Sequence, residues 1–352
     1  MFANGGPVSF RVARNYPRRS TLFHPFFYLR NVNMKIKPRC LSAGILFADV
    51  GCAPITHCPV PGELVQTDRV ELTLGGCASN VALNLAKLEV PTGLCGCVGD
   101  DAFSDFVFSA LQDPLIDLSG VRRVPNAGPG CSLIVNVKGE DRRFVSTTGA
   151  NAQFSLDDIP TAWTEESEVL YIGGFLMIPP LESDATVEYL KAFQARGGKT
   201  ILDVVLYGNR PYWPAIEPLL PYVDYFLPND DEARVICGKT DPVEQAKFFV
   251  DAGAKTCVVT CGGDGSIYYS ANEKFRADIF PVEFVGGTGS GDAFAAGFVS
   301  AVLDGCDPVE TVRRASAQGM SCVRDGSATR SVFTKAESEA FLAANELKIE
   351  SL

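Results

Sequence analysis

From about residue 40 onward, short apolar runs alternate with segments that have a helical pattern of apolar positions. In segments such as 79–88 and 243–252 the apolar residues recur three or four positions apart, which is typical of one buried helix face. Largely apolar runs, which indicate buried strands, occur at residues 41–49, 169–173, 200–205, 225–227 and 256–261. This alternation predicts β–α–β units and an α/β fold with a mostly parallel central sheet.

Two segments, at about residues 54–74 and 121–146, depart from this rhythm. Polar and apolar residues alternate in them without an intervening helix, and residues 138–141 have a turn-like sequence. The pattern predicts a small antiparallel sheet added to the α/β body. Beside a pocket, such a sheet would act as a lid that excludes water. Its apolar face would also suit pairing of two copies of the chain, so we expect a homodimer formed through this β lid.

The most informative stretch is the glycine-rich run at residues 287–298, which opens directly into an apolar helix. Residues 278–285 before it are expected to form a strand. A glycine-rich turn at a helix N-terminus leaves backbone N–H groups pointing at one spot, and phosphate is the usual occupant of such a site. Asp292 lies in this turn, where its carboxylate could accept a proton from a nucleophile. The run alone leaves open an alternative, which is a tight turn capped by Asp292.

Charge and composition narrow the function. The chain of 352 residues has a formal net charge of −11, which argues against nucleic acid as a partner. No apolar stretch is near the roughly 20 residues that span a membrane, so no membrane partner is expected. The 12 cysteines lack zinc-like spacing, and Cys95 and Cys97 lie in an apolar run that predicts buried thiols. A reducing, cytoplasmic setting fits these cysteines.

The first 38 residues differ from the rest of the chain. Residues 1–48 contain neither Asp nor Glu but several Lys and Arg residues. Arg18 and Arg19 superficially resemble the start of an export signal, but the apolar part is short and no cleavage site follows. We expect residues 1–38 to be a disordered extension, or the product of a start codon placed too early, with a transit peptide as the other alternative. The folded domain is expected at residues 39–345.

Several motifs, in this order, resemble those of the PfkB, or ribokinase-like, carbohydrate kinases over about residues 40–345. Residues 75–88 resemble the first family signature, and residues 287–292 resemble the second. Segments similar to other family motifs are 96–103, 141–144 with 149–151, 229–232 and 258–265. The resemblance implies a ribokinase-like three-layer α/β/α fold with a small β lid. It also implies an ATP-dependent kinase that uses Mg²⁺ and transfers the γ-phosphoryl group to a hydroxyl of a small carbohydrate.

On the acceptor side, the resemblance assigns Asp49, Gly75, Gly76 and Asn80 to substrate binding. The glycines permit close backbone approach to a small ligand, and Asn80 offers a donor and an acceptor to hydroxyl groups. A strand-to-helix turn with an Asn cap is the structural alternative.

The catalytic residues implied by the resemblance lie in the second signature. Asp292 would contact the substrate and act as the general base that takes the proton of the acceptor hydroxyl. The backbone amides of Gly289, Ser290, Gly291 and Asp292 would form the anion hole for the transferring phosphoryl group.

The nucleotide side is expected to include eight residues: Asn229, Glu232, Thr260, Gly262, Gly265, Thr288, Gly289 and Gly291. Glu232 would hold Mg²⁺ through water, because Mg²⁺ keeps most of its waters. An acidic first helical turn, favoured by the helix dipole, is the alternative for Glu232.

The chain also departs from the family pattern. Gly286 stands where many members have an Asp that helps bind an activating monovalent cation, which makes such activation doubtful. Cys77 and Phe47 replace residues that ribokinases place around ribose, so ribose itself is disfavoured. A sugar acceptor is expected, with a nucleoside as the alternative. A kinase-fold regulatory protein without catalysis is a further possibility, although Asp292 and the signature glycines are all present.

Overall fold

The computed structural model describes residues 36–140, 143–325 and 327–352. Most of the expectation for residues 1–38 therefore lies outside the described residues. Within the described part of the chain, no helix has the length and apolar character needed to cross a membrane.

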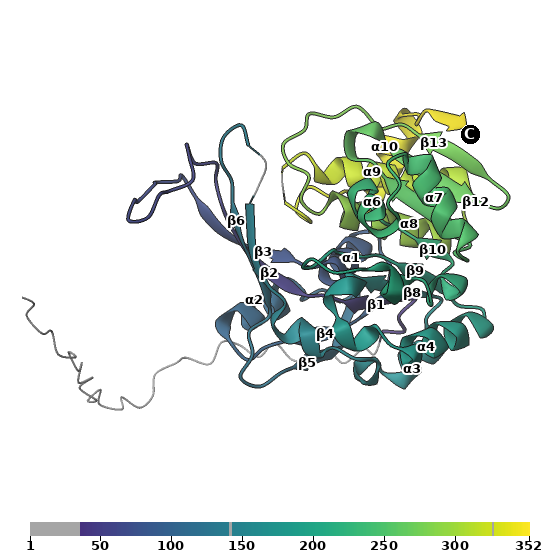
Figure 1. The fold of residues 1–352 in the computed structure, drawn as a ribbon, viewed down its shortest axis with the longest axis horizontal. Coiled ribbons are helices and arrows are strands. Elements are labelled where there is room, and N and C mark those ends of the chain that lie inside the picture. Colours follow the sequence, from purple (N-terminus) through teal and green to yellow (C-terminus); the bar gives the residue numbers. More distant parts are fainter. Residues whose placement is uncertain (1–35, 141–142, 326) are drawn as a thin grey trace, which may run out of the picture. The chain divides into compact units, whose positions relative to one another are not determined.

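Within the described residues, ten strands form one large sheet in the order β14-β13-β12-β11-β10-β9-β8-β1-β4-β5. Their bounds are β1 Cys40–Gly44, β4 Thr92–Val98, β5 Ile116–Arg123, β8 Val169–Gly173, β9 Lys199–Leu202, β10 Tyr225–Phe226, β11 Thr256–Thr260, β12 Ser266–Ser270, β13 Lys274–Ala277 and β14 Ile349–Ser351. The strands from β5 to β11 run parallel to their neighbours, and β12, β13 and β14 continue the sheet in antiparallel fashion. The predicted α/β fold with a mostly parallel sheet is confirmed (Figure 1).

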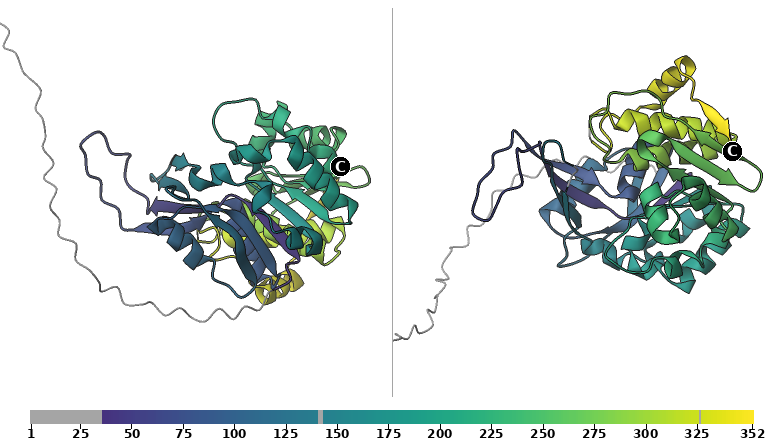
Figure 2. Two further views of the ribbon diagram at one scale, coloured as in Figure 1. Left: turned by 90° about the horizontal axis from the view of Figure 1, so that it is seen from below. Right: turned by 45° about the horizontal axis from the view of Figure 1, so that its top comes forward.

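Helices lie on both faces of the large sheet (Figure 2). Those of the described residues are α1 Cys77–Lys87, α2 Ala102–Ala110, α3 Thr161–Glu166, α4 Asp184–Ala195, α5 Trp213–Ile216, α6 Asp230–Cys237, α7 Pro242–Asp251, α8 Ser290–Leu303, α9 Pro308–Cys322 and α10 Lys335–Ala344. From the central strands β1 and β8, the chain runs through α1 towards β4 and through α4 towards β9. Because parallel crossovers are right-handed in nearly all proteins, these two helices are expected on opposite faces of the sheet. The apolar strands between them are fully buried, as in β1, β4 and β8. Cys95 and Cys97 in β4 are buried free thiols, as predicted.

A second sheet contains four strands of the described chain, in the order β3-β2-β6-β7. Their bounds are β2 Phe47–Cys52, β3 Val70–Gly75, β6 Gly130–Val135 and β7 Arg143–Thr147. The pairs β2–β3 and β6–β7 are antiparallel, whereas β2 and β6 run parallel. The small sheet therefore begins at residue 47, and residues 121–123 complete β5 of the large sheet.

The expected strand at residues 41–49 is divided in two. Gly44 ends β1 with φ of 150°, and Ile45 N–H donates to Gly173 O over 3.1 Å. The chain then enters β2 of the small sheet after only Ile45 and Leu46. Asp49 consequently lies in the middle of a strand of the small sheet and not at the end of a central strand.

Residues 278–285 do not form a strand in the structure, so that prediction is wrong. Pro281 lies in the middle of this segment and has no N–H to donate to a neighbouring strand. The segment ends instead against the chain that follows α9, because the N–H groups of Val285 and Gly286 donate to Val323 O over 2.9 and 3.1 Å. The glycine-rich turn is thus approached by irregular chain.

Two neighbouring rows of side chains in the small sheet differ in polarity. Asp49 on β2 has Thr73 and Ser132 as its cross-strand partners, and Ser146 lies opposite Ser132. The next row, which points to the other face because side chains alternate along a strand, consists of Val50, Leu72, Leu133 and Val145. We call these the polar row and the apolar row.

Candidate active site

The glycine-rich turn leads directly into α8, as predicted. Gly289 precedes the helix with φ of 76°, and a Cβ atom on it would lie 2.2 Å from the Cβ of Ala328. By contrast, a Cβ on Gly291 would have no neighbouring atom within 4 Å. Ser290 N–H donates to Gly287 O over 3.2 Å. The first N–H groups of α8 have no carbonyl partner within the helix, so its N-terminus can receive an anion beside Gly291.

Asp292 lies in the first turn of α8 and is tied to another helix. Asn80 in the first turn of α1 donates from Nδ2 to Asp292 Oδ2 over 2.7 Å. Burial raises the pKa of Asp292, and the hydrogen bond from Asn80 opposes that shift. A hydrogen-bonded carboxylate with a raised pKa is a stronger base than an exposed one.

A cavity of about 180 Å³ lies in front of Asp292. Gly289 and Gly291 line it from α8, and the other polar residues around it come from segments that follow the carboxyl ends of β9, β10 and β11, namely Asp203, Asn229, Glu232 and Thr260. Ligands of open α/β sheets bind at this edge, close to where the strand order reverses, which here is between β1 and β8.

Three carboxylates line this cavity, and its lining within the described chain contains no Lys, Arg or His. Burial and the charge of Asp292 raise the pKa of Asp203 to about 7. Burial, with the charge of Asp203 as the next cause, raises the pKa of Glu232 to about 8. The cavity therefore concentrates negative charge that lacks a counter-ion, and a cation would be stabilised in it.

Asn229 and Glu232 form a capping box at the start of α6. Glu232 N–H donates to Asn229 Oδ1 over 2.8 Å, and Asn229 N–H donates to Glu232 Oε2 over 3.0 Å. The helix-terminus alternative for Glu232 is thus realised, and the same carboxylate also lines the cavity. Asn229 and Thr260 are joined by an isolated parallel bridge, which holds the two segments side by side.

Three residues predicted to bind the nucleotide, Gly262, Gly265 and Thr288, are not part of the lining of this cavity. Gly262 and Gly265 form the turn after β11. Gly265 has φ of 83°, and a Cβ on it would lie 2.0 Å from Ala277 O, so its absence of a side chain is a structural need. The carbonyl of Thr288 accepts a hydrogen bond from the Cys322 thiol over 3.3 Å.

The predicted acceptor residues converge from the small sheet and α1. A Cβ on Gly75 would lie only 1.9 Å from Asp49 Oδ2, so the glycine makes room for that carboxylate. Gly76 has φ of 88° and would meet Ile45 O at 2.5 Å. Asp49 Oδ1 and Asn80 Oδ1 are buried acceptors without a hydrogen-bond partner among the described residues. Burial raises the pKa of Asp49 to about 6, and the charge of Asp292 adds to that rise.

The structure brings to the site three residues to which the sequence analysis gave no role in binding or catalysis: Asp203, Cys77 and Ser132. Asp203 follows β9, and its Oδ2 accepts a hydrogen bond from the Tyr171 hydroxyl over 2.6 Å. The sulfur of Cys77 and one carboxylate oxygen each of Asp203 and Asp292 all lie within 4.8 Å of one another. Ser132 of the polar row hydrogen-bonds to Asp49. Only Asp203 had a usable signal, since a carboxylate that follows an apolar strand marks the ligand edge of the sheet.

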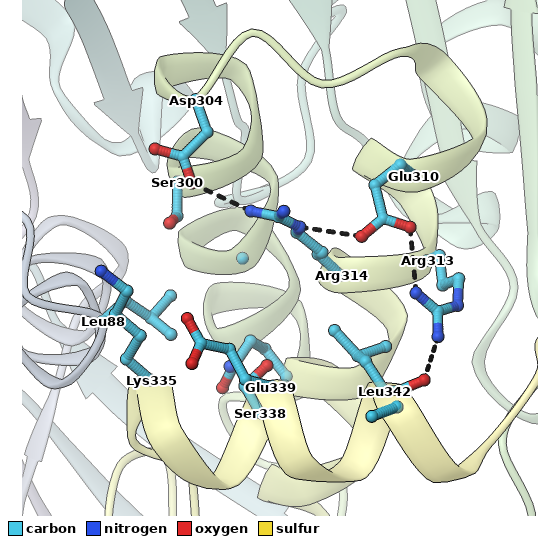
Figure 3. Close-up of a pocket in the computed structure, with 13 residues that line it drawn as sticks. Leu88, Ser300, Asp304, Glu310, Arg313, Arg314, Lys335, Ser338, Glu339 and Leu342 are labelled. Atoms are coloured by element: carbon cyan, nitrogen blue, oxygen red, sulfur yellow. Dashed lines mark hydrogen bonds and ion pairs between the residues drawn. The ribbon is translucent and has the colours of Figure 1, made fainter.

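A larger cavity of about 560 Å³ lies between α8, α9 and α10 (Figure 3). Ion pairs connect the residues that line it. Arg314 pairs with Glu310 and with Asp304 over 2.9 Å each, and Arg313 pairs with Glu310 over 3.0 Å. None of the residues predicted for acceptor, nucleotide or catalysis lines it. The cavity in front of Asp292 is therefore the candidate active site.

A three-layer α/β protein with an open helix N-terminus beside a buried carboxylate has the parts of a phosphoryl-transfer enzyme. A sequence pattern of the family described as "pfkB family carbohydrate kinase" matches residues 38–335. The chain belongs to this family, whose members are phosphotransferases acting on sugar hydroxyl groups.

Relatives of known activity are similar over most of the chain. A ribokinase from Haemophilus influenzae is 27% identical over 288 residues, which cover 80% of this chain and 91% of the relative. A 5-dehydro-2-deoxygluconokinase from Clostridium perfringens is 27% identical over 278 residues, which cover 74% and 81%. These activities differ in their sugar, so the relatives support a sugar kinase without fixing its acceptor.

Solved structures show the same fold. The ribokinase of Thermotoga maritima matches with a TM-score of 0.73 and 27% identity over 86% of this chain and 99% of that one. The ribokinase of Arabidopsis thaliana, solved as a complex with ribose and ATP, matches with a TM-score of 0.75 and 26% identity over 87% and 99%. The predicted ribokinase-like fold is confirmed.

The two turn glycines should respond differently to the same substitution. We expect Gly289→Ala to lower the free energy of unfolding by about 2–4 kcal/mol, because the new methyl group overlaps Ala328 and the backbone is left-handed. Gly291→Ala is the matched control and should change it by less than about 1 kcal/mol, since space is open there. Denaturant unfolding measures both, and equal losses would contradict the described geometry.

Proposed function

We propose that the protein is an ATP-dependent sugar kinase that transfers the γ-phosphoryl group of ATP to a hydroxyl of a small carbohydrate. The observation that supports this most directly is the hydrogen bond from Asn80 to Asp292. It joins a polar residue of the first family signature to the carboxylate of the second, at the open N-terminus of α8.

In this proposal Asp292 is the general base. Its buried carboxylate accepts the proton of the acceptor hydroxyl as that oxygen attacks the γ-phosphorus. The backbone N–H groups at Gly289, Gly291 and Asp292, together with the positive end of the helix dipole, stabilise negative charge on the transferring group. The Ser290 N–H, also predicted for this role, donates to Gly287 O in the structure and holds the turn closed. Asp49 and Asn80 bind the acceptor, and each has one buried oxygen available to accept from a hydroxyl.

The electrostatics of the cavity support a divalent cation with the nucleotide. A triphosphate would meet Asp203, Glu232 and Asp292 without a lining Lys, Arg or His in the described chain. Mg²⁺ would screen this repulsion. In this proposal Glu232 would hold it through water, with Asn229, Thr260 and Thr288 on the nucleotide side and Gly262 and Gly265 in the turn beyond β11. A monovalent cation is not included, because Gly286 offers no carboxylate.

The polar row of the small sheet supports a sugar acceptor. Asp49, Thr73, Ser132 and Ser146 form this row beside the predicted acceptor site. Hydroxyl groups of a sugar match such a row.

Asp292→Asn tests the proposed base. The amide keeps the shape of the side chain but cannot accept the proton, so kcat should fall by about 10²–10⁴-fold. ATP binding should persist, which isothermal titration with MgATP measures. Turnover close to wild type in this variant would contradict the role of Asp292.

An acceptor screen tests the reaction class. In a coupled assay of ADP release, we expect at least one pentose, hexose or sugar acid to give turnover above the rate with ATP alone, and nucleosides to give none. Turnover with nucleosides alone would favour the nucleoside kinase. Ligand-dependent thermal stabilisation with no ADP release for any acceptor would favour the regulatory protein.

The apolar row supports the expected homodimer through the small sheet. Val145 and Leu133 are 67% and 50% exposed, and Leu72 beside them is 39% exposed. An apolar strip on a sheet face is stabilised when a second copy covers it. We expect Leu133→Asp to convert a dimer into a monomer in analytical ultracentrifugation. Val60→Asp, on an exposed loop residue outside the strands, is the matched control, and a wild-type monomer would contradict the dimer.

A reducing, cytoplasmic setting also stays a prediction. It is supported by the 12 cysteines, all of which are free thiols in the structure.

A further inference from the structure

The polar row contains hydroxyl groups that lead across the small sheet to Asp49. Ser132 lies directly opposite Asp49 on β6, and Ser146 lies opposite Ser132 on β7. Directly opposite residues share one face of a sheet, with their side chains in reach of each other. The three side chains therefore run in a line from the edge strand to the predicted acceptor site.

The hydrogen bonds along this line have a direction. Ser146 Oγ donates to Ser132 Oγ over 3.0 Å. Hydrogen bonding from Ser132, which lies directly opposite, lowers the pKa of Asp49. Since the Ser132 hydroxyl accepts from Ser146, its own hydrogen is available to Asp49, and hydrogen bonds in such a chain polarise one another. The Ser132 side chain is well shielded, with 9% of the residue exposed.

Asp49 is held on one side and open on the other. Its Oδ2 lies over Gly75, where a Cβ would come within 1.9 Å. Its Oδ1 is buried without a hydrogen-bond partner in the described part of the chain. Such an orphaned acceptor is costly, so a ligand that donates a hydroxyl to it is favoured.

The charged surroundings of Asp49 oppose its ionisation. The charge of Asp292 on α8 acts on Asp49, and burial with the charge of Asp49 raises the pKa of the Cys131 thiol on β6. Burial and Asp292 raise the pKa of Asp49, whereas the hydrogen bonds from Ser132 lower it. Ser132 is thus the neighbour that stabilises the charged form of the carboxylate.

We propose that Ser132, supported by Ser146, is a positioning residue that orients the Asp49 carboxylate towards an acceptor with adjacent hydroxyl groups. A carboxylate with two available lone-pair directions recognises a diol through two donated hydrogen bonds. This inference rests on the proposed function, because it requires Asp49 to contact the acceptor.

Ser132→Ala tests the inference in the full-length chain. We expect the KM for the sugar acceptor to rise about ten-fold, as befits loss of a hydrogen bond to a charged group, while the KM for ATP stays within about two-fold. Loss of the hydrogen bond raises the pKa of Asp49, so the acidic limb of the kcat/KM profile for the acceptor should move to higher pH. Ser132→Thr retains a hydroxyl and should restore both values.

Two further variants separate positioning from general damage to the sheet. Ser146→Ala lies on an exposed strand and should shift the acidic limb in the same direction by a smaller amount. Thr147→Val is the matched control, because Thr147 follows Ser146 on β7 and its side chain points to the other face of the sheet, where its hydroxyl accepts from Gly149 N–H over 3.3 Å. It should leave the acidic limb unchanged.

The outcomes distinguish this inference from the proposed function. If Ser132→Ala keeps the wild-type acceptor KM and acidic limb, or if Thr147→Val shifts them equally, Ser132 does not position Asp49. Undiminished turnover in Asp292→Asn would instead overturn the proposed catalytic base, whatever the Ser132 variants show.

Discussion

The hydrogen bond between Asn80 and Asp292 is the contact on which the arrangement of the site depends. It spans 2.7 Å and joins the first turns of α1 and α8, which lie more than 200 residues apart in the sequence. Both helices begin with glycine residues in left-handed backbone, Gly76 and Gly289. These glycines bring two helix N-termini together at the carboxyl edge of the sheet. The acceptor residues and the anion-binding turn can therefore act on one ligand.

The negative charge of the cavity is the second constraint. Burial raises the pKa of Asp203 to about 7 and that of Glu232 to about 8, and the charge of Asp292 adds to both rises. Without a cation, charge repulsion would oppose binding of a polyphosphate. A bound cation would favour the ionised form of the same carboxylates. In the proposed reaction, the excess of buried acids would therefore make nucleotide binding depend on a cation.

The sequence predicts the fold and the grouping of the site better than it predicts local breaks in strands. Periodicity finds the buried strands and the helices, because burial on the sheet requires continuous apolar runs. It misplaces Asp49, because the turn at Ile45 and Leu46 is apolar and continues the pattern of β1. There the side chain of Asn151 holds the turn through 2.9 Å hydrogen bonds to both backbone groups of Leu46, which no local pattern reveals. The role of Ser132 is likewise invisible until the register of β2 and β6 is known.

The short connection at Ile45 and Leu46 also explains how the small sheet can serve two purposes. It passes directly from β1, in the centre of the molecule, to β2, so the register of the small sheet is fixed relative to the active site. Because side chains alternate along β2, Asp49 and Val50 must point to opposite faces. A shift of one residue would exchange the polar row for the apolar row and remove the acceptor carboxylate. The register that places Asp49 beside Gly75 is therefore the same one that leaves Leu72, Leu133 and Val145 available for a second copy.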